Sequence, residues 1–274
     1  MIYILSGIIT RIISNSYLNV FQKLLTKEGN KPSVVNFYTY LGLSILGIFL
    51  YPFFKLSPST ELITVFAIMG ILGALGNYFI IKALSVGELS SLAPINSYKP
   101  IVALIIAFFY LKEVPSLSAI VGILLIIFGT YILYCNGNYN KIAVFYRVFA
   151  LIFSGSEAVF IKKIILLTNI PTSFVLWSIS GLIFTLLFAL YSKHKLTFPN
   201  IKYQGMLVLS VAIMQYSTNY VFSKINVSYA LALFQLSTLL SVFLGANIFH
   251  EKGLKRKIAA SVIMIIGAVV IILN

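Results

Sequence analysis

The chain has 274 residues, of which 60% are hydrophobic and only 9% are charged, and its mean hydropathy is +1.01. A water-soluble domain carries about 25% charged residues, so this composition excludes a soluble globular protein and indicates an integral membrane protein. The formal net charge of +14 comes from 20 Lys and Arg against six Glu. The basic residues lie mostly between apolar runs and form no block. We therefore expect contact with the lipid bilayer and no nucleic-acid partner.

Residues that carry enzyme chemistry are scarce in the sequence. Cys135 is the single Cys, so an intrachain disulfide is impossible. No phosphate-binding loop, nucleophile–base pair or cluster of metal ligands is apparent. We expect no cofactor, no metal and no enzymatic activity.

Ten apolar stretches follow one another along the chain, each long enough to cross about 30 Å of hydrocarbon as a helix. Their runs do not alternate with a period of two, which excludes barrel strands. The first stretch lacks a basic start and a cleavage site, so we expect a span and not a removable signal. The sequence thus predicts an all-α integral membrane protein with ten transmembrane helices, at residues 2–24, 33–54, 61–83, 88–111, 115–135, 142–167, 172–192, 203–224, 229–250 and 256–273.

Segments of the first half recur in the same order in the second half. NYFIIK at 77–82 matches NYVFSK at 219–224, and GILLIIFGTYIL at 122–133 matches ASVIMIIGAVVI at 260–271. The polar connector CNGNYNK lies between the halves, which we place at residues 1–136 and 141–274. Because five helices per half is an odd number, the second half must enter the membrane inverted. Two inverted five-helix repeats are typical of transporters whose site lies between the halves.

Two further segments resemble a known family. PINSYKPIVALIIAFFYLKE at 94–113 and SVFLGANIFHEKGLKRKIAASVIMIIGAVVIIL at 241–273 are similar to the repeat ends of EamA-type transporters of the drug/metabolite transporter superfamily. The resemblance covers nearly the whole chain and implies ten helices and an alternating-access carrier. It leaves the substrate open, since the family carries amino acids, sugars, nucleotide derivatives and drugs. One departure is that the second half has no counterpart of Pro100.

The first predicted helix carries a polar stripe. Arg11, Asn15, Asn19 and Gln22 fall within an arc of about 80° on an ideal helix. Such a stripe faces a cavity or other helices and not lipid. Lining of a binding cavity and interhelical hydrogen bonding are both open interpretations for Asn15 and Asn19.

The fourth predicted helix carries Asn96, Tyr98 and Lys99 beside Pro94 and Pro100. A proline removes a backbone donor and disfavours helical geometry at the residue before it. A loosened turn beside a cation resembles the broken-helix sites of transporters. We expect Asn96, Tyr98 and Lys99 to bind substrate, with Lys99 and Arg11 binding an anionic group; a packing kink is the alternative.

Glu157, in FSGSEAVFIKK at 153–163, is the only acid well inside a predicted span. Desolvation favours the neutral form of a carboxyl group, whereas a nearby cation favours the ionised form. We predict that Glu157 exchanges protons during transport. The alternative is a structural ion pair with Lys99 or Arg11.

Amides recur in the second half. Gln215, Asn219 and Gln235 are candidates for hydrogen bonding to substrate, although Asn219 and its repeat counterpart Asn77 lie near helix ends, where capping is common. Trp177 is interpreted as an interfacial or packing residue. The remaining acids of interest, Glu113 and Glu251, are expected to cap the helices that follow them.

Two lines of reasoning about orientation disagree. The resemblance implies that both termini face the cytoplasm, but the basic residues of the connectors and helix ends, with Arg147 counted among them, favour termini outside. The leading hypothesis for function is a secondary active transporter of a small polar or amphiphilic organic metabolite in the cell membrane, with proton-coupled export as one mechanism. An exchanger of anionic metabolites of the sugar-phosphate or nucleotide-sugar type is one alternative, and an intramembrane scaffold or assembly factor is another.

Overall fold

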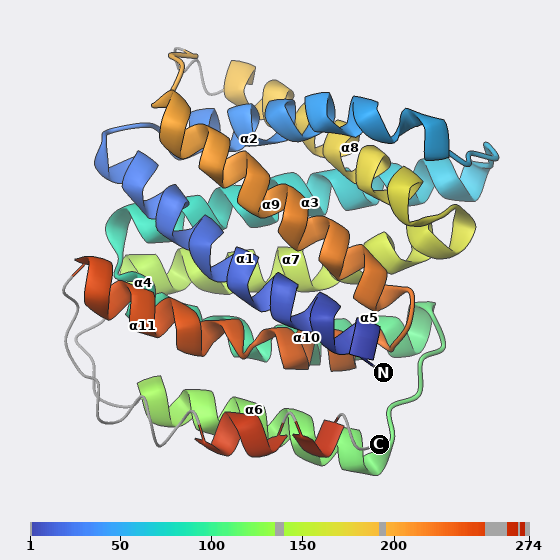
Figure 1. Cartoon of the computed structure of the whole chain (residues 1–274), viewed down its shortest axis with the longest axis vertical. Coiled ribbons are helices and arrows are strands. Elements are labelled where there is room, and N and C mark those ends of the chain that lie inside the picture. Colours follow the sequence, from blue (N-terminus) through green and yellow to red (C-terminus); the bar gives the residue numbers. More distant parts are fainter. Residues whose placement is uncertain (1, 135–139, 192–195, 250–261, 268, 272–274) are drawn as a thin grey trace.

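The computed structural model describes residues 2–134, 140–191, 196–249, 262–267 and 269–271, and within these ranges the regular secondary structure is helical (Figure 1). The first half contains α1 (Ile2–Lys27), α2 (Pro32–Gly47), the 3-10 helix η1 (Ile48–Phe53), α3 (Thr60–Val86), α4 (Leu89–Leu92), η2 (Ala93–Tyr98), α5 (Lys99–Tyr110) and α6 (Leu117–Tyr134). The second half contains α7 (Lys141–Leu167), α8 (Ile170–Tyr191), α9 (Ile201–Phe222), α10 (Val227–Phe234), α11 (Ser237–Phe249) and a last apolar segment, Val262–Ile271.

Polar residues mark where several of these helices begin. The side chain of Ser59 accepts a hydrogen bond from the Leu62 amide at the start of α3, and Asn140 and Asn200 cap α7 and α9 in the same way. These side chains satisfy amides that have no partner in the first helical turn. The connectors therefore set the helix boundaries close to those that the apolar runs predict.

Four helical stretches in the described part of the chain are long and apolar enough to span a membrane: Pro32–Phe53, Thr60–Val86, Ile170–Tyr191 and Val227–Gly245. Helices α1, α7 and α9 have 26, 27 and 22 residues and are equally long, but they are less apolar. Several of their polar residues, such as Arg11, Arg147 and Gln215, line an interior cavity. The all-helical membrane class is confirmed, while a count of ten crossings stays a prediction.

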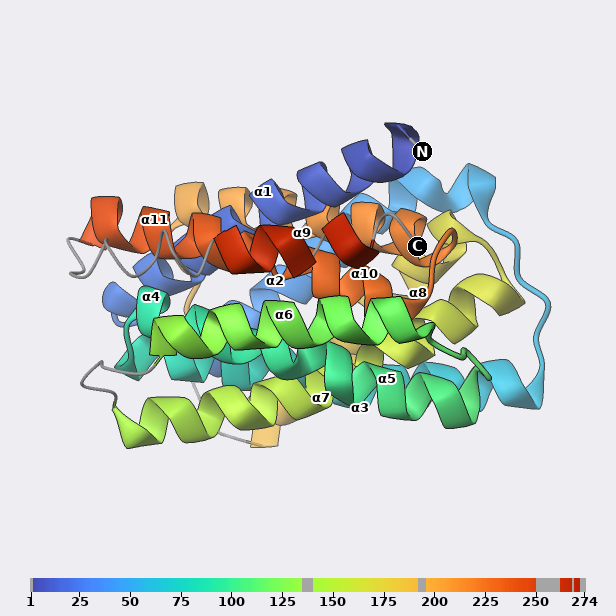
Figure 2. The same ribbon diagram turned by 90° about the horizontal axis from the view of Figure 1, so that it is seen from below.

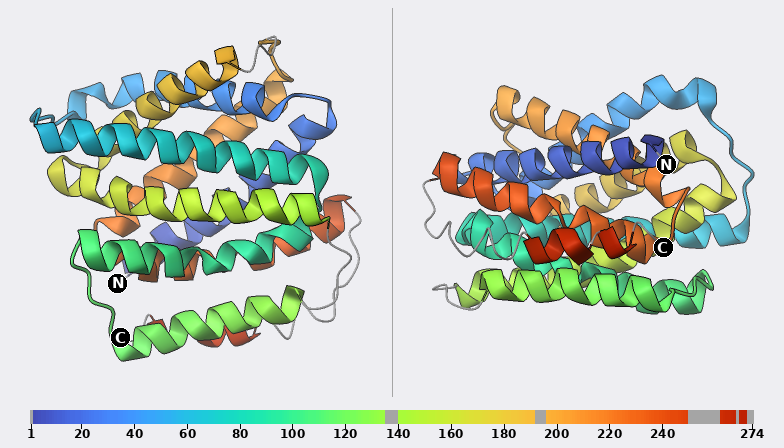
Figure 3. Two further views of the ribbon diagram at one scale, coloured as in Figure 1. Left: turned by 180° about the vertical axis from the view of Figure 1, so that it is seen from behind. Right: turned by 60° about the horizontal axis from the view of Figure 1, so that its bottom comes forward.

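Each main contact between a helix of the first half and a helix of the second half has an equivalent contact in which the two halves trade places. Helix α1 packs along α9, and α7, the counterpart of α1, packs along α3, the counterpart of α9. Figure 3 shows α3 and α7 side by side from behind, and α2 packs against its own counterpart α8. We call α4, η2 and α5 the fourth segment of the first half, and α10 with α11 the fourth segment of the second half. These two segments meet through α5 and α10. This exchange of contacts is the arrangement that a twofold relation between repeats produces.

The fifth segments, α6 and Val262–Ile271, lie side by side at one edge of the bundle (Figures 1 and 2). A Cβ atom on Gly122 would lie 2.7 Å from the carbonyl oxygen of Gly267, and a Cβ atom on Gly267 would lie 2.6 Å from that of Gly122. Backbone contact this close needs glycine on both helices. The contact joins the last helix of each half, although the repeat alignment pairs Gly267 with Gly129 and not with Gly122.

Both fourth segments are broken near their middle. In the first half, η2 separates α4 from α5, and Pro100 lies at the start of α5. In the second half, bonds from Gln235 N to Ala232 O at 3.0 Å and from Thr238 N to Gln235 O at 2.8 Å tighten the turn between α10 and α11. The second half thus breaks without the proline that the first half has. The sequence difference at Pro100 does not remove the symmetry.

Candidate functional site

A cavity of about 100 Å³ lies at the centre of the bundle and takes its lining from both halves. Among the residues predicted to bind substrate or protons, the structure brings seven together there: Arg11, Asn15, Asn19, Asn96, Lys99, Glu157 and Gln215. Three others lie outside the lining. Tyr98 is 38% exposed on the outer surface, and Asn219 and Gln235 are buried behind the residues that face the cavity.

Arg11 lies on the inward face of α1 and is only 7% exposed. Its Nε and Nη1 atoms are buried without a hydrogen-bond partner among the described residues. The guanidinium carbon lies 4.8 Å from the ring centroid of Phe234, which supports the cation from one side. A buried guanidinium with free donors is a strong binding group for an oxyanion.

The other residues of the polar stripe on α1 both line the cavity and form hydrogen bonds between helices. Asn15 and Asn19 line the cavity, and Asn15 Nδ2 also donates to Ser237 Oγ at 2.9 Å. The neighbouring Ser16 Oγ donates to the carbonyl of Ser237 at 3.0 Å, at the break between α10 and α11. Further along, Gln22 Nε2 donates to Asn77 Oδ1 at 3.1 Å. The stripe therefore lines the cavity and ties α1 to α3 and α11.

Two basic residues line the cavity next to the break in the fourth segment of the first half. Lys99 begins α5 and lines the cavity. Arg147 of α7 also lines it, is 5% exposed, and donates from Nε to the carbonyl of Leu92 at 3.2 Å. That carbonyl belongs to the last residue of α4, so the bond ties α7 to the segment that leads into the break. The charge count that favoured termini outside included Arg147 with the connectors and helix ends, but its side chain is buried in α7 and lines the cavity, so it does not belong in that count.

Amides support the same cavity from behind. Asn96 Nδ2 donates to Gln235 Oε1 at 3.3 Å and so links the two breaks. Gln215 faces the cavity and donates from Nε2 to Asn219 Oδ1 at 2.8 Å. Gln235 and Asn219 thus orient amides that face the cavity and do not face it themselves. Asn77, expected to cap a helix end, instead faces the cavity and donates to Asn36 Oδ1.

Glu157 is 9% exposed and faces the cavity from α7. Trp177 of α8 donates from Nε1 to Glu157 Oε1 at 2.5 Å. Among the described residues, no ion pair joins Glu157 to Lys99 or Arg11. Trp177 is 6% exposed, packs against Tyr40 and lines the cavity, so of its two interpretations packing fits the structure and an interfacial position does not. No spacing in the sequence links positions 157 and 177, because the contact is between different helices.

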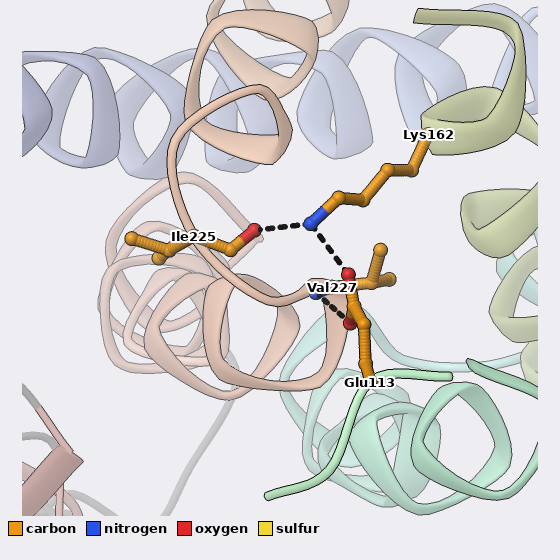
Figure 4. Close-up of polar contacts among 4 residues, drawn as sticks. All are labelled: Glu113, Lys162, Ile225 and Val227. Atoms are coloured by element: carbon orange, nitrogen blue, oxygen red, sulfur yellow. Dashed lines mark hydrogen bonds and ion pairs between the residues drawn. The ribbon is translucent and has the colours of Figure 1, made fainter. Parts of the chain in front are cut away.

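Glu113 caps a helix, but not the one that follows it. Its Oε2 accepts a hydrogen bond from the Val227 amide at 2.9 Å, at the start of α10, and its Oε1 lies 2.5 Å from Lys162 Nζ (Figure 4). Lys162 Nζ also donates to the Ile225 carbonyl at 2.8 Å. We define Glu113, Lys162, Ile225 and Val227 as the clamp. It joins the chain just after α5 to α7 and to the start of α10. Glu251 lies outside the described residues.

Breaking the clamp is expected to destabilise the protein more than breaking a neighbouring surface pair. Lys162 and Glu113 side chains are 12% and 11% exposed, whereas those of the Lys163–Glu61 pair are 24% and 51% exposed. Lys162→Met leaves a buried carboxylate without its cation, which costs about 3–5 kcal/mol, whereas Lys163→Met costs about 1 kcal/mol or less. Thermal unfolding in detergent measures both. Adding Glu113→Gln to Lys162→Met should restore part of the loss, and equal losses for the two Lys variants would contradict this role.

These features define a multi-pass helical membrane protein with a polar interior cavity between two related halves. The EamA-like transporter family matches the chain over residues 1–135 and 141–273. The chain belongs to the EamA-like transporter family, which places it in the drug/metabolite transporter superfamily, whose members are transporters and not enzymes.

A solved structure described as "Crystal structure of protein" superimposes with a TM-score of 0.73 and covers 97% of this chain and 95% of that chain. Its sequence identity of 14% means that the similarity shows the fold alone. None of the curated proteins matches the sequence.

Proposed function

We propose that the protein is a secondary active transporter that carries a small polar organic metabolite across the cell membrane by alternating access. The central cavity carries this proposal. Charged and amide side chains from α1, α5, α7 and α9 converge on it, although each costs free energy in a membrane interior unless it serves a ligand or a partner. Its position between two related halves is the one that alternating access requires.

The charges in the cavity favour a substrate with an anionic group. Arg11, Lys99 and Arg147 face one acid, Glu157, so the positive side chains outnumber the negative ones among the lining residues. A carboxylate or phosphate on the substrate would offset this excess, and Arg11 has free donors for it. This observation supports exchange of an anionic metabolite as the second candidate mechanism.

A scaffold would use its polar residues differently. It would direct them outward toward partner helices, since interhelical hydrogen bonds hold membrane complexes together. Here the cavity encloses Arg11, Lys99, Arg147 and Glu157, while the outer surface presents apolar side chains such as Phe49 at 75% and Phe109 at 68% exposure. The carrier is therefore the function that the arrangement supports best.

Reconstitution of the purified protein in liposomes tests the carrier. We expect a subset of carboxylate or phosphate-monoester metabolites to raise its thermal stability and to exchange across the membrane, while uncharged analogues of the same size do neither. Binding of a ligand to the folded state alone stabilises it in proportion to occupancy. A broad panel in which no solute exchanges and none shifts the unfolding temperature would reject the carrier.

A further inference from the structure

Trp177 is the single Trp in the chain, and its indole N–H donates to the carboxylate of Glu157 across the interface between α8 and α7. The donor–acceptor distance is 2.5 Å, and both side chains are buried. A bond from a neutral donor to a carboxylate is stronger when the carboxylate is ionised than when it is protonated. The bond can therefore distinguish the two protonation states of Glu157.

Two glycines shape the pocket around this bond. A Cβ atom on Gly73 of α3 would collide with Oε1 of Glu157 and lie 3.4 Å from the hydroxyl oxygen of Tyr40. A Cβ atom on Gly181 of α8 would overlap the ring of Tyr40. The Tyr40 and Trp177 ring centroids are 5.1 Å apart with planes inclined by 55°. The indole is thus enclosed between Tyr40 and Glu157.

The other titratable groups at this pocket come from several helices. Tyr40 lies on α2, Lys99 on α5 and Arg11 on α1, and all three line the same cavity as Glu157. Arg147 lines it from α7, the helix that carries Glu157. In the described structure none of the three cations forms an ion pair with Glu157. Trp177 is the residue that holds the carboxylate by a hydrogen bond.

We propose that Trp177 is a positioning residue that transmits the protonation of Glu157 to helix α8. This rests on the proposed function, in which Glu157 exchanges protons. When Glu157 is ionised, the bond fixes the indole against Tyr40 and holds α8 to α7 and α2. When Glu157 takes up a proton, the bond weakens and the indole is released, so that α8 can shift against α2. The proton enters or leaves Glu157 through the cavity, and Trp177 itself is not protonated.

The fluorescence of Trp177 tests this directly in the purified full-length protein in nanodiscs, because no other Trp contributes. We expect the emission to change in one titration step with pH. In Glu157→Gln the amide oxygen still accepts the indole proton but no longer ionises, so the step should disappear. The same step in Glu157→Gln, or flat emission in the wild-type protein, would overturn the proposal. This measurement needs no substrate, so it stands or fails separately from transport.

The pH profile of transport provides the second test. Trp177→Phe keeps an aromatic ring and removes the donor to Glu157, so the ionised carboxylate loses a stabilising bond. We expect the midpoint of the profile to move toward higher pH by about one unit. Phe174→Leu, which alters buried aromatic packing on the same helix without removing a hydrogen bond, is the control and should leave the midpoint unchanged. A lower rate with an unshifted midpoint in Trp177→Phe would show that Trp177 only fills space.

Discussion

Replacement of Arg11 by Gln is expected to weaken the binding of anionic solutes by about a hundredfold, because hydrogen bonds to a charged group contribute about 1.5–3 kcal/mol. The free Nε and Nη1 atoms of Arg11 are the donors that an oxyanion would use. Arg11→Lys should retain part of the affinity, because it keeps the charge and loses the planar fork. Ligand-induced thermal shifts and uptake into liposomes measure both variants.

The stability of the ligand-free protein distinguishes a binding group from a structural one. An unpaired buried cation costs free energy, so Arg11→Gln should leave the empty protein as stable as the wild type or more stable. Lys202→Gln, which removes an exposed cation at the start of α9, is the matched control and should change neither affinity nor stability. Equal loss of anionic and uncharged ligands in Arg11→Gln, or collapse of the fold, would contradict an anion site at Arg11.

Glu157→Gln is expected to abolish proton-driven flux while solute–solute exchange continues. The amide cannot bind and release a proton, but its oxygen can still accept the indole N–H of Trp177, so the fold should persist. Desolvation in a closed cavity favours the neutral acid, and an approaching cation or water favours the carboxylate, so alternation between the two would couple proton and solute movement. Uptake driven by an imposed pH gradient, compared with counterflow without a gradient, measures the two activities.

The structural rival makes the opposite prediction for the same variant. If Glu157 neutralised Lys99 or Arg11 in a fixed pair, Glu157→Gln would strand a buried cation and destabilise the fold by several kcal/mol. Neutralising Lys99 or Arg11 in addition would then restore the fold. The described structure contains no such pair, so we expect neither the loss nor the rescue. Misfolding of Glu157→Gln with recovery in the double variant would reject proton coupling.

Much of the architecture is written locally in the sequence. A helix long enough to cross hydrocarbon needs about 20 apolar residues in succession, and this requirement can be read from one segment without knowledge of its neighbours. The repeated segments NYFIIK and NYVFSK likewise predict two related halves. The stripe of Arg11, Asn15 and Asn19 identifies a polar face because the helical period fixes which residues of one helix share a side.

Only the tertiary structure shows which partner each polar side chain contacts. Periodicity places Gln215 and Asn219 on one face of α9, but only packing against α8 puts Gln215 at the cavity and Asn219 behind it. The bond between Trp177 and Glu157 and the turn of Arg147 toward Leu92 depend in the same way on how separate helices cross. Glu113 reaches Val227, 114 positions along the chain, and not the next helix. Hydrophobic pattern specifies each helix and its apolar surface, whereas partners are chosen by three-dimensional packing, for which a single sequence carries no local signal.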